Sequence, residues 1–340
     1  MRDAATLSRI RALAIPPAWT DVWIAPDPDA HLQATGRDAR GRKQYRYHPQ
    51  WRAERDREKY SRLVEFCHAL PRLRRAVAKD LACRCLCKNK VVATVVALME
   101  RAQLRVGNDE YARTNGSYGA TTLRDRHARF HGDTLELSYT GKSGIARRVK
   151  LTDRRLARIV RSCRDLPGQR LFQYIDGDQI RAITSTDVND YIRAIAGDFT
   201  AKDYRTWAGT LGAAVLLCGL EHPGSERKCK ACVKQVIEQV AEQLGHTPAV
   251  CRASYIHPQL IDDFNGNQLR ELATAIQRHG AAFDVDVLRA VEGAVAKYLK
   301  ASSRRRSPTA PASGQARGRR RPARLSSSSR RGRSAARRGR

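Results

Sequence analysis

The amino-acid sequence predicts an α+β protein, on three observations along its 340 residues. Residues 1–70 contain short alternating runs typical of β-strands, which predict a small β-rich N-terminal domain. Residues 71–300 follow a helical period apart from one stretch of period two, which predicts a mostly α-helical domain carrying a small antiparallel β-sheet. Residues 301–340 hold almost no large apolar side chain, so we expect a disordered basic tail.

Three short runs in the N-terminal domain are expected to be strands: Asp21–Ile24, His31–Thr35 and Gln44–His48. The loop before the third strand, GRDARGRK, combines glycine with basic side chains. Such a loop suits phosphate contacts, and the amide and aromatic side chains of Gln44, Tyr45 and Tyr47 suit contacts to base edges. The candidate phosphate-binding residues are Arg37, Arg40, Arg42 and Lys43. The alternative is a solvated charged face.

The main domain is predicted to begin with helix over residues 71–103, followed by a helix-like segment from Arg105 that breaks at Asn115-Gly116. Residues 121–151 then alternate with period two around two turns, which predicts antiparallel strands. The second turn, TGKSG, places Lys142 at its tip. A lysine there is free to swing towards a neighbouring groove, or it remains in solvent.

After Asp153 the helical period returns and is expected to persist to about Leu299. Two pairs have the spacing of helix capping boxes: Thr184 with Asp187, and Thr200 with Asp203. The second pair places Arg205 in the first turns of a helix. Asp203 and Tyr204 are candidates to orient the Arg205 guanidinium.

The segment LGHTPAVCRASYIHP, residues 244–258, holds a histidine and a tyrosine with a helix start between them. Gly245 ends the preceding helix and Thr247-Pro248 is typical of an N-cap, so we expect His246 on a turn and Tyr255 on a short helix. A tyrosine is only about 0.1% phenolate at neutral pH, so a nucleophilic Tyr255 needs activation by other side chains. The alternative is a capping histidine and a tyrosine whose hydroxyl lies in water.

Charge indicates the kind of partner. The net charge is +30, and residues 304–340 contribute fourteen arginines and no acidic residue, which leaves +16 on the first 303 residues. Both parts are therefore basic, which favours a polyanion such as nucleic acid. No apolar run approaches the roughly 20 residues that cross a bilayer, and the N-terminus lacks an apolar signal-peptide core, so we expect a cytoplasmic protein with no membrane partner.

Cysteine usage favours reduced thiols, because nine is an odd number. Cys83, Cys85 and Cys87 could be joined with Cys229 and Cys232 as a zinc site. The CxCxC spacing does not match the paired motifs of such sites, so we expect no metal.

Six motifs taken in order resemble the type IB DNA topoisomerases, specifically their small poxvirus-like bacterial branch. They are TGRDARGRKQYRYH in the N-terminal part, RVGNDEY with Arg105, GKSG with Lys142, KDYRTW with Lys202 and Arg205, LGHTP with His246, and SYIHP with Tyr255. The resemblance covers about residues 10–265.

The resemblance implies an enzyme that relaxes supercoiled duplex DNA through a 3′-phosphotyrosyl link to Tyr255, without ATP, metal or another cofactor. Arg105, Arg205 and His246 would stabilise the transition state, and Lys142 would be the general acid, sharing that work with Arg105. It further implies DNA contacts by Lys202 and a monomer that forms a clamp around the duplex at the nucleoid. The family normally has additional strands ahead of RIRALAIPPAW, so either the start of this sequence is misplaced or the clamp is built on a thinner sheet. In the second case we expect weaker and more salt-sensitive DNA binding.

Two other interpretations remain at this point. Tyrosine recombinases run the same covalent step, but they usually show His-x-x-Arg where this chain has Lys202-Asp-Tyr-Arg205, and they lack the basic N-terminal module. A catalytically inactive DNA-binding protein would lack one of the five catalytic residue types, and none is missing here.

Overall fold

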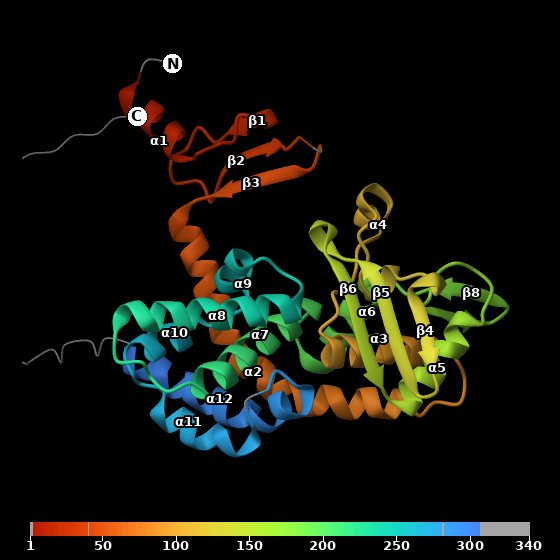
Figure 1. Cartoon of the computed structure of the whole chain (residues 1–340). Helices are drawn as coiled ribbons and strands as arrows, with labels where there is room; N and C mark the ends of the chain where they lie inside the picture. Colours follow the sequence, from red (N-terminus) through yellow and green to blue (C-terminus); the bar gives the residue numbers. More distant parts are fainter. Residues whose placement is uncertain (1–2, 40, 281, 307–340) are drawn as a thin grey trace, which may run out of the picture.

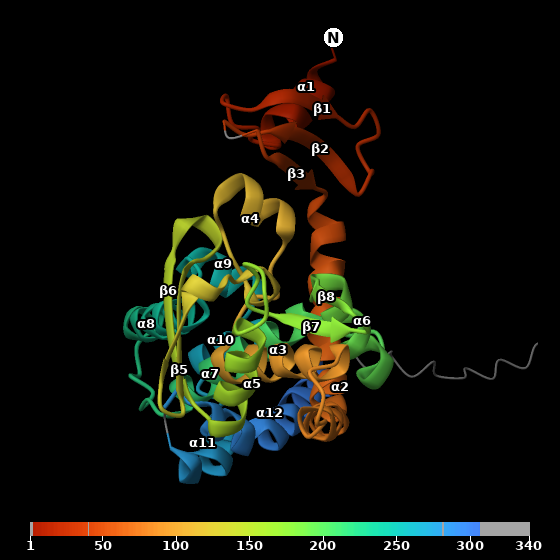
Figure 2. The same ribbon diagram turned by 90° about the vertical axis from the view of Figure 1, so that its right-hand side faces the viewer.

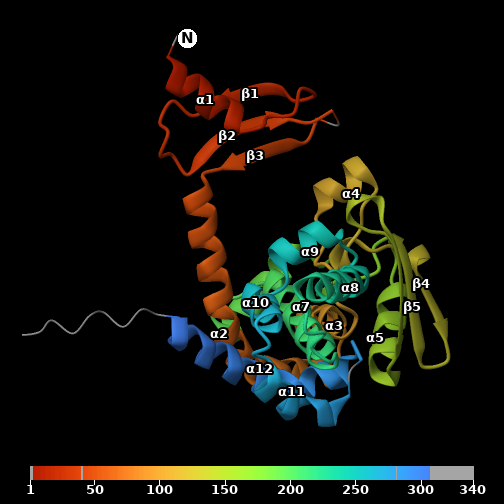
Figure 3. The same ribbon diagram turned by 60° about the vertical axis from the view of Figure 1, so that its left-hand side comes forward.

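The computed structural model describes residues 3–39, 41–280 and 282–306. A small N-terminal sheet and a larger, mostly helical body are joined by one long helix (Figures 1 and 3). The α+β class is confirmed. The predicted disorder of the basic tail falls largely on residues 307–340, which lie outside the described residues. Residues 301–306 continue the last helix instead of starting the tail.

The N-terminal part contains helix α1 (Ala4–Ala12) and strands β1 (Thr20–Ile24), β2 (Leu32–Arg37) and β3 (Lys43–Tyr47). The strands are antiparallel in the order β1-β2-β3, which confirms the three predicted strands. Along β3 the exposed positions alternate with half-buried ones, because successive side chains of a strand point to opposite faces.

Helix α2 (Pro49–Leu81) corrects the expectation that residues 1–70 consist of strands and loops. The helix runs without a break through residue 70, so the division of the chain at that residue stays a prediction. His48 caps its first turn, and Pro71 lies inside it, where the missing N–H favours a bend. Its early turns rise towards the N-terminal sheet (Figure 1).

The predicted antiparallel sheet is confirmed in the body. Its strands β4 (Ala128–His131), β5 (Thr134–Thr140) and β6 (Ala146–Thr152) pair in that order, and the β5–β6 turn carries Lys142. Leu135 and Leu137 of β5 are buried, and helix α5 (Arg154–Arg164) packs beside this strand (Figure 2).

A second hairpin, β7 (Gln173–Asp176) and β8 (Gln179–Ala182), corrects the expectation of uninterrupted helix after Asp153. Its strands have four residues each, too few for a two-residue period to stand out in the sequence. The remaining helices are α3 (Lys88–Ala102), α4 (Asp109–Asn115), α6 (Ser185–Ala196), α7 (Ala201–Cys218), α8 (Glu226–Leu244), α9 (Pro248–Ser254), α10 (Pro258–Asn265), α11 (Arg270–Ile276) and α12 (Val285–Arg306).

Helices α3 and α7 form the centre of the body. Residues 91–99 of α3 are all buried, as is most of α7. These two helices are therefore rigidly packed, and they fix the positions of the side chains they carry and of the segments that follow them. The predicted capping at the start of α7 is present, since the Asp203 carboxylate accepts from Thr200 N at 2.7 Å. At α6, Thr184 and Asp187 bond reciprocally as predicted. In the described part of the chain, every helix is too short or too polar to span a membrane.

Candidate active site

The turn between α8 and α9 presents the histidine and the tyrosine. Gly245 ends α8 with φ +63°, a conformation that favours glycine, and His246 N donates to Ala241 O at 2.8 Å. Thr247 caps α9 by accepting from Val250 N, as the sequence predicts. The helix ends at Ser254, so Tyr255 lies directly after α9 with φ −129°, not on the helix as expected.

Two arginines from distant segments converge on His246. Arg105 Nη2 lies 3.0 Å from Nδ1 and 3.2 Å from Nε2 of the imidazole, and Arg205 Nη2 lies 3.0 Å from Nε2. Because a guanidinium only donates hydrogen bonds, the ring accepts through an unprotonated nitrogen. The Tyr255 ring lies beside the same imidazole, with centroids 4.2 Å apart, and Arg205 Cζ lies 5.7 Å from the Tyr255 ring centroid.

Backbone carbonyls hold Arg205, not the neighbours that the sequence suggested. Its guanidinium donates to Gln103 O and to Leu244 O, which end α3 and α8 respectively. Asp203 instead caps α7, so the expectation that Asp203 and Tyr204 orient Arg205 finds no support in its bonding. Within the described residues, the buried Nε of Arg205 has no hydrogen-bond partner.

Burial and like charge shift the pKa values in this cluster. Burial, reinforced by Arg105 and Arg205, lowers the pKa of His246 to about 3, so the imidazole is neutral at physiological pH. Burial and the charge of Arg105 lower the pKa of Arg205 to about 10. Desolvation, with the charges of Arg105 and Arg42, lowers the pKa of Lys142.

Lys142 approaches the cluster from the β5–β6 turn. The turn, residues 142–144, places Ser143 at φ +65° and Gly144 at φ +75°. Lys142 and Arg105 both line a cavity of about 550 Å³, bounded by α4 and by Arg42 of the N-terminal part. The basic loop of the small sheet therefore reaches the catalytic body at this cavity.

Two residues of α7 hold the tyrosine, and sequence reasoning missed both. Thr210 Oγ1 donates to Tyr255 O at 3.3 Å and accepts from His257 N at 3.2 Å, so one buried hydroxyl bonds the backbone on both sides of Ile256. A Cβ on Gly209 would lie 2.7 Å from Tyr255 O, so only glycine allows this close approach. A glycine and a threonine in a small-residue helix carry no distinguishing signal in the sequence.

Arg147 on β6 is a further residue that sequence reasoning missed. Its guanidinium donates to Glu242 O at 3.0 Å and to Gln243 O at 2.9 Å, at the last turn of α8. These bonds tie the sheet to the turn that carries His246. Alternating basic residues on an exposed strand do not reveal such a partner.

The candidate DNA-binding residues of the N-terminal sheet lie on two sides of β3. Tyr45 and Tyr47 are exposed and stacked, with centroids 6.1 Å apart, and Tyr47 stacks on Trp51 at 4.7 Å. Lys43 lies over the Tyr45 ring at 5.8 Å. Gln44 is on the opposite face, because side chains alternate along a strand, and its amide bonds Asp38 at 2.9 Å.

The other basic candidates are distributed as follows. Arg37 is exposed and pairs with Asp21 at 3.4 Å, Arg42 pairs with Asp38 at 2.6 Å, and Arg40 lies outside the described residues. Lys202 is exposed in the first turn of α7, near Lys59 of α2, and not in the cluster around His246. DNA binding by all of these residues stays a prediction.

All nine cysteines are unpaired in the structure, and their reduced state in the cell stays a prediction. Cys83, Cys85 and Cys87 lie between α2 and α3, whereas Cys229 and Cys232 lie on α8. Nowhere among the described residues do His, Cys, Asp or Glu gather in a group of three or more that could hold a metal ion.

A basic sheet joined to a body with clustered arginine, lysine, histidine and tyrosine defines an enzyme that acts on nucleic acid. The family model for the eukaryotic DNA topoisomerase I catalytic core matches residues 48–281, and the model for the bacterial DNA topoisomerase IB N-terminal domain matches residues 1–38. The chain therefore belongs to the type IB DNA topoisomerases, which confirms the resemblance seen in its motifs.

Viral relatives agree with this assignment. The DNA topoisomerase 1B of Acanthamoeba polyphaga mimivirus is 35% identical over 272 residues, covering 77% of this chain and 80% of the relative. The DNA topoisomerase I of Monkeypox virus is 20% identical over 233 residues, covering 67% of this chain and 70% of the relative.

Proposed function

We propose that this member of the type IB family relaxes supercoils by cutting one DNA strand through a 3′-phosphotyrosyl link to Tyr255, letting the free end rotate, and resealing the strand. The observation that carries the proposal is the convergence of Arg105 and Arg205 on His246, with the Tyr255 ring 4.2 Å from that imidazole. Four of the five side chains are thereby within reach of one phosphate.

The chemistry follows from the groups present. The Tyr255 oxygen attacks phosphorus, the phenolic proton passes to water, and the bond from phosphorus to the 5′-oxygen breaks. The phosphorane carries extra negative charge, which the guanidinium groups of Arg105 and Arg205 stabilise with paired donors. The neutral His246 donates its single N–H to a non-bridging oxygen.

Lys142 is the proposed general acid that gives the 5′-oxygen its proton. A lowered pKa suits this role, because a proton is transferred most effectively by an acid whose pKa lies near the working pH. The 5′-hydroxyl later attacks the phosphotyrosine and reverses the sequence. Since the phosphodiester is exchanged for another phosphodiester, neither ATP nor a metal ion is needed.

We propose further that one protein monomer encloses the duplex between the N-terminal sheet and the helical body, which lie at opposite ends of the early turns of α2 (Figure 3). The exposed Tyr45 and Tyr47 and the basic loop support duplex contacts on the sheet side. Such a protein would act at the nucleoid in the cytoplasm.

Plasmid relaxation in EDTA and without ATP tests the function. We expect relaxation of both positive and negative supercoils, and a covalent adduct whose DNA carries a free 5′-hydroxyl. Tyr255→Phe should abolish relaxation and adduct while retaining duplex binding. Tyr174→Phe, which removes a phenol hydroxyl from β7 outside the cluster, is the matched control and should remain active. A covalent adduct that persists in the Tyr255→Phe variant would refute the assignment of Tyr255 as the nucleophile.

A further inference from the structure

Helix α5 carries a face of arginines that the proposed reaction does not use. We call this the arginine face; it consists of Arg154, Arg155, Arg158, Arg161 and Arg164. The opposite side of the helix is apolar and buried, and consists of Leu156, Ala157, Ile159, Val160 and Cys163. At 3.6 residues per turn, the arginines occupy about half of the helix circumference. The helix is therefore anchored by one side and presents only positive charge on the other.

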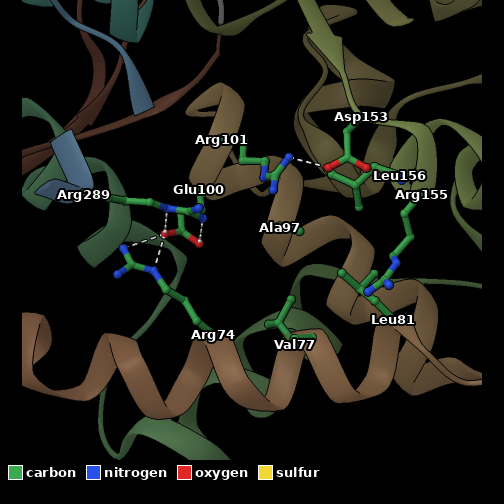
Figure 4. Close-up of a pocket in the computed structure, with 11 residues that line it drawn as sticks. Arg74, Val77, Leu81, Ala97, Glu100, Arg101, Asp153, Arg155, Leu156 and Arg289 are labelled. Carbon is green, nitrogen blue, oxygen red and sulfur yellow. Dashed lines mark hydrogen bonds and ion pairs between the residues drawn. The ribbon is translucent and has the colours of Figure 1, made fainter. Parts of the chain in front are cut away.

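Three members of the arginine face have no partner within the described part of the protein. The side chains of Arg154, Arg155 and Arg158 are exposed and make no hydrogen bond, ion pair or ring contact there. Figure 4 shows Arg155 at the edge of a pocket without an interaction, whereas Arg101 in the same pocket is bound by Asp153. The free arginines are thus not counter-charges for acidic neighbours.

The other two members are held in place. Arg161 and Arg164 lie over the Phe130 ring, with Cζ 5.0 and 4.8 Å from its centroid, and Arg164 lies 3.5 Å from Asp165. Arginines three and four residues apart on a helix repel one another, so this arrangement weakens the helix when nothing binds it. An external anion would relieve the repulsion.

The arginine face lies far from the candidate active site. Strand β6 runs from the Lys142 turn to Thr152, and its seven residues extend roughly 24 Å before α5 begins. Figures 1 and 3 agree that α5 lies on the side of the body away from the N-terminal sheet. A short duplex held near Lys142 would leave the arginine face uncovered.

The chemistry of the face fits a phosphate backbone. Guanidinium groups bind phosphate with paired donors, and along the helix Arg154, Arg158 and Arg161 are spaced by about 6 and 4.5 Å. Each DNA strand repeats a phosphate every 3.4 Å or so along the duplex axis, so successive arginines can each reach one. If α5 binds only the phosphate backbone of DNA, it contacts no base edges and has no sequence preference.

We propose that the arginine face binds a second stretch of duplex DNA while the first occupies the active site. The inference rests on the proposed function, because it assigns a duplex to the active site. Supercoiled DNA brings two duplex segments close together, whereas a relaxed circle rarely does. The second contact therefore gives the enzyme a preference for the form of DNA on which it acts.

The test replaces Arg154, Arg155 and Arg158 together by glutamine in the Tyr255→Phe protein, which cannot cleave if Tyr255 is the nucleophile. Binding to supercoiled plasmid, relaxed circle and a duplex of about 20 base pairs is measured across a salt series. A matched control replaces the exposed Arg227, Lys228 and Lys234 of α8 by glutamine, with the same loss of charge on a different helix.

We expect the α5 variant to lose its preference for supercoiled plasmid. The slope of log K against log salt should fall by up to about 3 on that DNA, at roughly 0.9 per phosphate contact. Binding to the short duplex should change less than twofold. Replacement of the same arginines by lysine should keep most of the preference.

Two results would overturn the proposal. One is an unchanged preference for supercoiled plasmid in a variant whose far-ultraviolet circular dichroism is that of the parent. The other is an equal loss of the preference for supercoiled plasmid in the α8 control, which would show that the preference depends on net charge and not on the arginine face. The test measures DNA binding and does not depend on cleavage. If the Tyr255→Phe protein still relaxed plasmid, Tyr255 would not be the nucleophile, but the binding results for the arginine face would keep their meaning.

Discussion

Replacing Thr210 by valine should slow DNA cleavage with little change elsewhere in the protein. Valine keeps the shape of the side chain and removes the hydroxyl that bonds Tyr255 O and His257 N. Each of these hydrogen bonds contributes on the order of 1 kcal/mol net. Together the two hydrogen bonds therefore contribute about 2 kcal/mol of free energy towards holding the segment that carries the proposed nucleophile in place.

The rate follows from that figure. If the restraint serves to hold the phenol beside His246, its loss raises the barrier by about 2 kcal/mol and slows cleavage roughly 30-fold. Single-turnover cleavage of a short duplex under saturating enzyme measures this directly, because rotation and product release do not contribute. Binding of the same duplex should be unchanged, since Thr210 is buried beneath the tyrosine.

Two variants make the result decisive. Thr210→Ser keeps the hydroxyl and should cleave within about threefold of the parent. Thr206→Val removes a buried hydroxyl one turn earlier on α7, which among the described residues bonds only Lys202 O, at 3.2 Å, and the variant should cleave normally. Parental cleavage by Thr210→Val, or equal slowing by Thr206→Val, would show that the α7 hydroxyl does not position the tyrosine.

Three further predictions concern the proposed acid, the histidine and the tail. Lys142→Ala should slow cleavage by about two decades or more, and a substrate with a 5′-sulfur leaving group, which needs no proton, should restore the rate; equal slowing on both substrates would rule out the acid role. The pKa of His246 is lowered below its unfolded value of 6.5, so folding favours the neutral ring and stability should fall as pH drops from 6.5 towards 3. His246→Asn should flatten that part of the stability–pH curve measured by urea unfolding, and a curve of the original slope would contradict the shift. Deletion after Arg306, which leaves α12 complete, should reduce the salt tolerance of plasmid binding without changing cleavage at low salt, and an identical salt slope would exclude a DNA contact by the tail.

Local signals in the sequence predicted much of the candidate site. Gly245 predicts the end of α8 and Thr247 predicts the start of α9. These signals can be found in the sequence because a left-handed C-cap and a side-chain N-cap involve only residues of the adjoining turn. The strand alternation around Lys142 is equally local. Even there the prediction erred by one residue, since α9 ends just before Tyr255.

The sequence by itself determined the residue types, the family and the turns that carry His246, Tyr255 and Lys142, since motifs and caps depend on neighbours along the chain. The tertiary structure alone decided what holds them. Arg205 is bound by carbonyls of Gln103 and Leu244, and Tyr255 by the hydroxyl of Thr210. Every residue offers a backbone carbonyl, so no pattern marks which one a distant side chain will meet; only the packing of α3, α7 and α8 selects it.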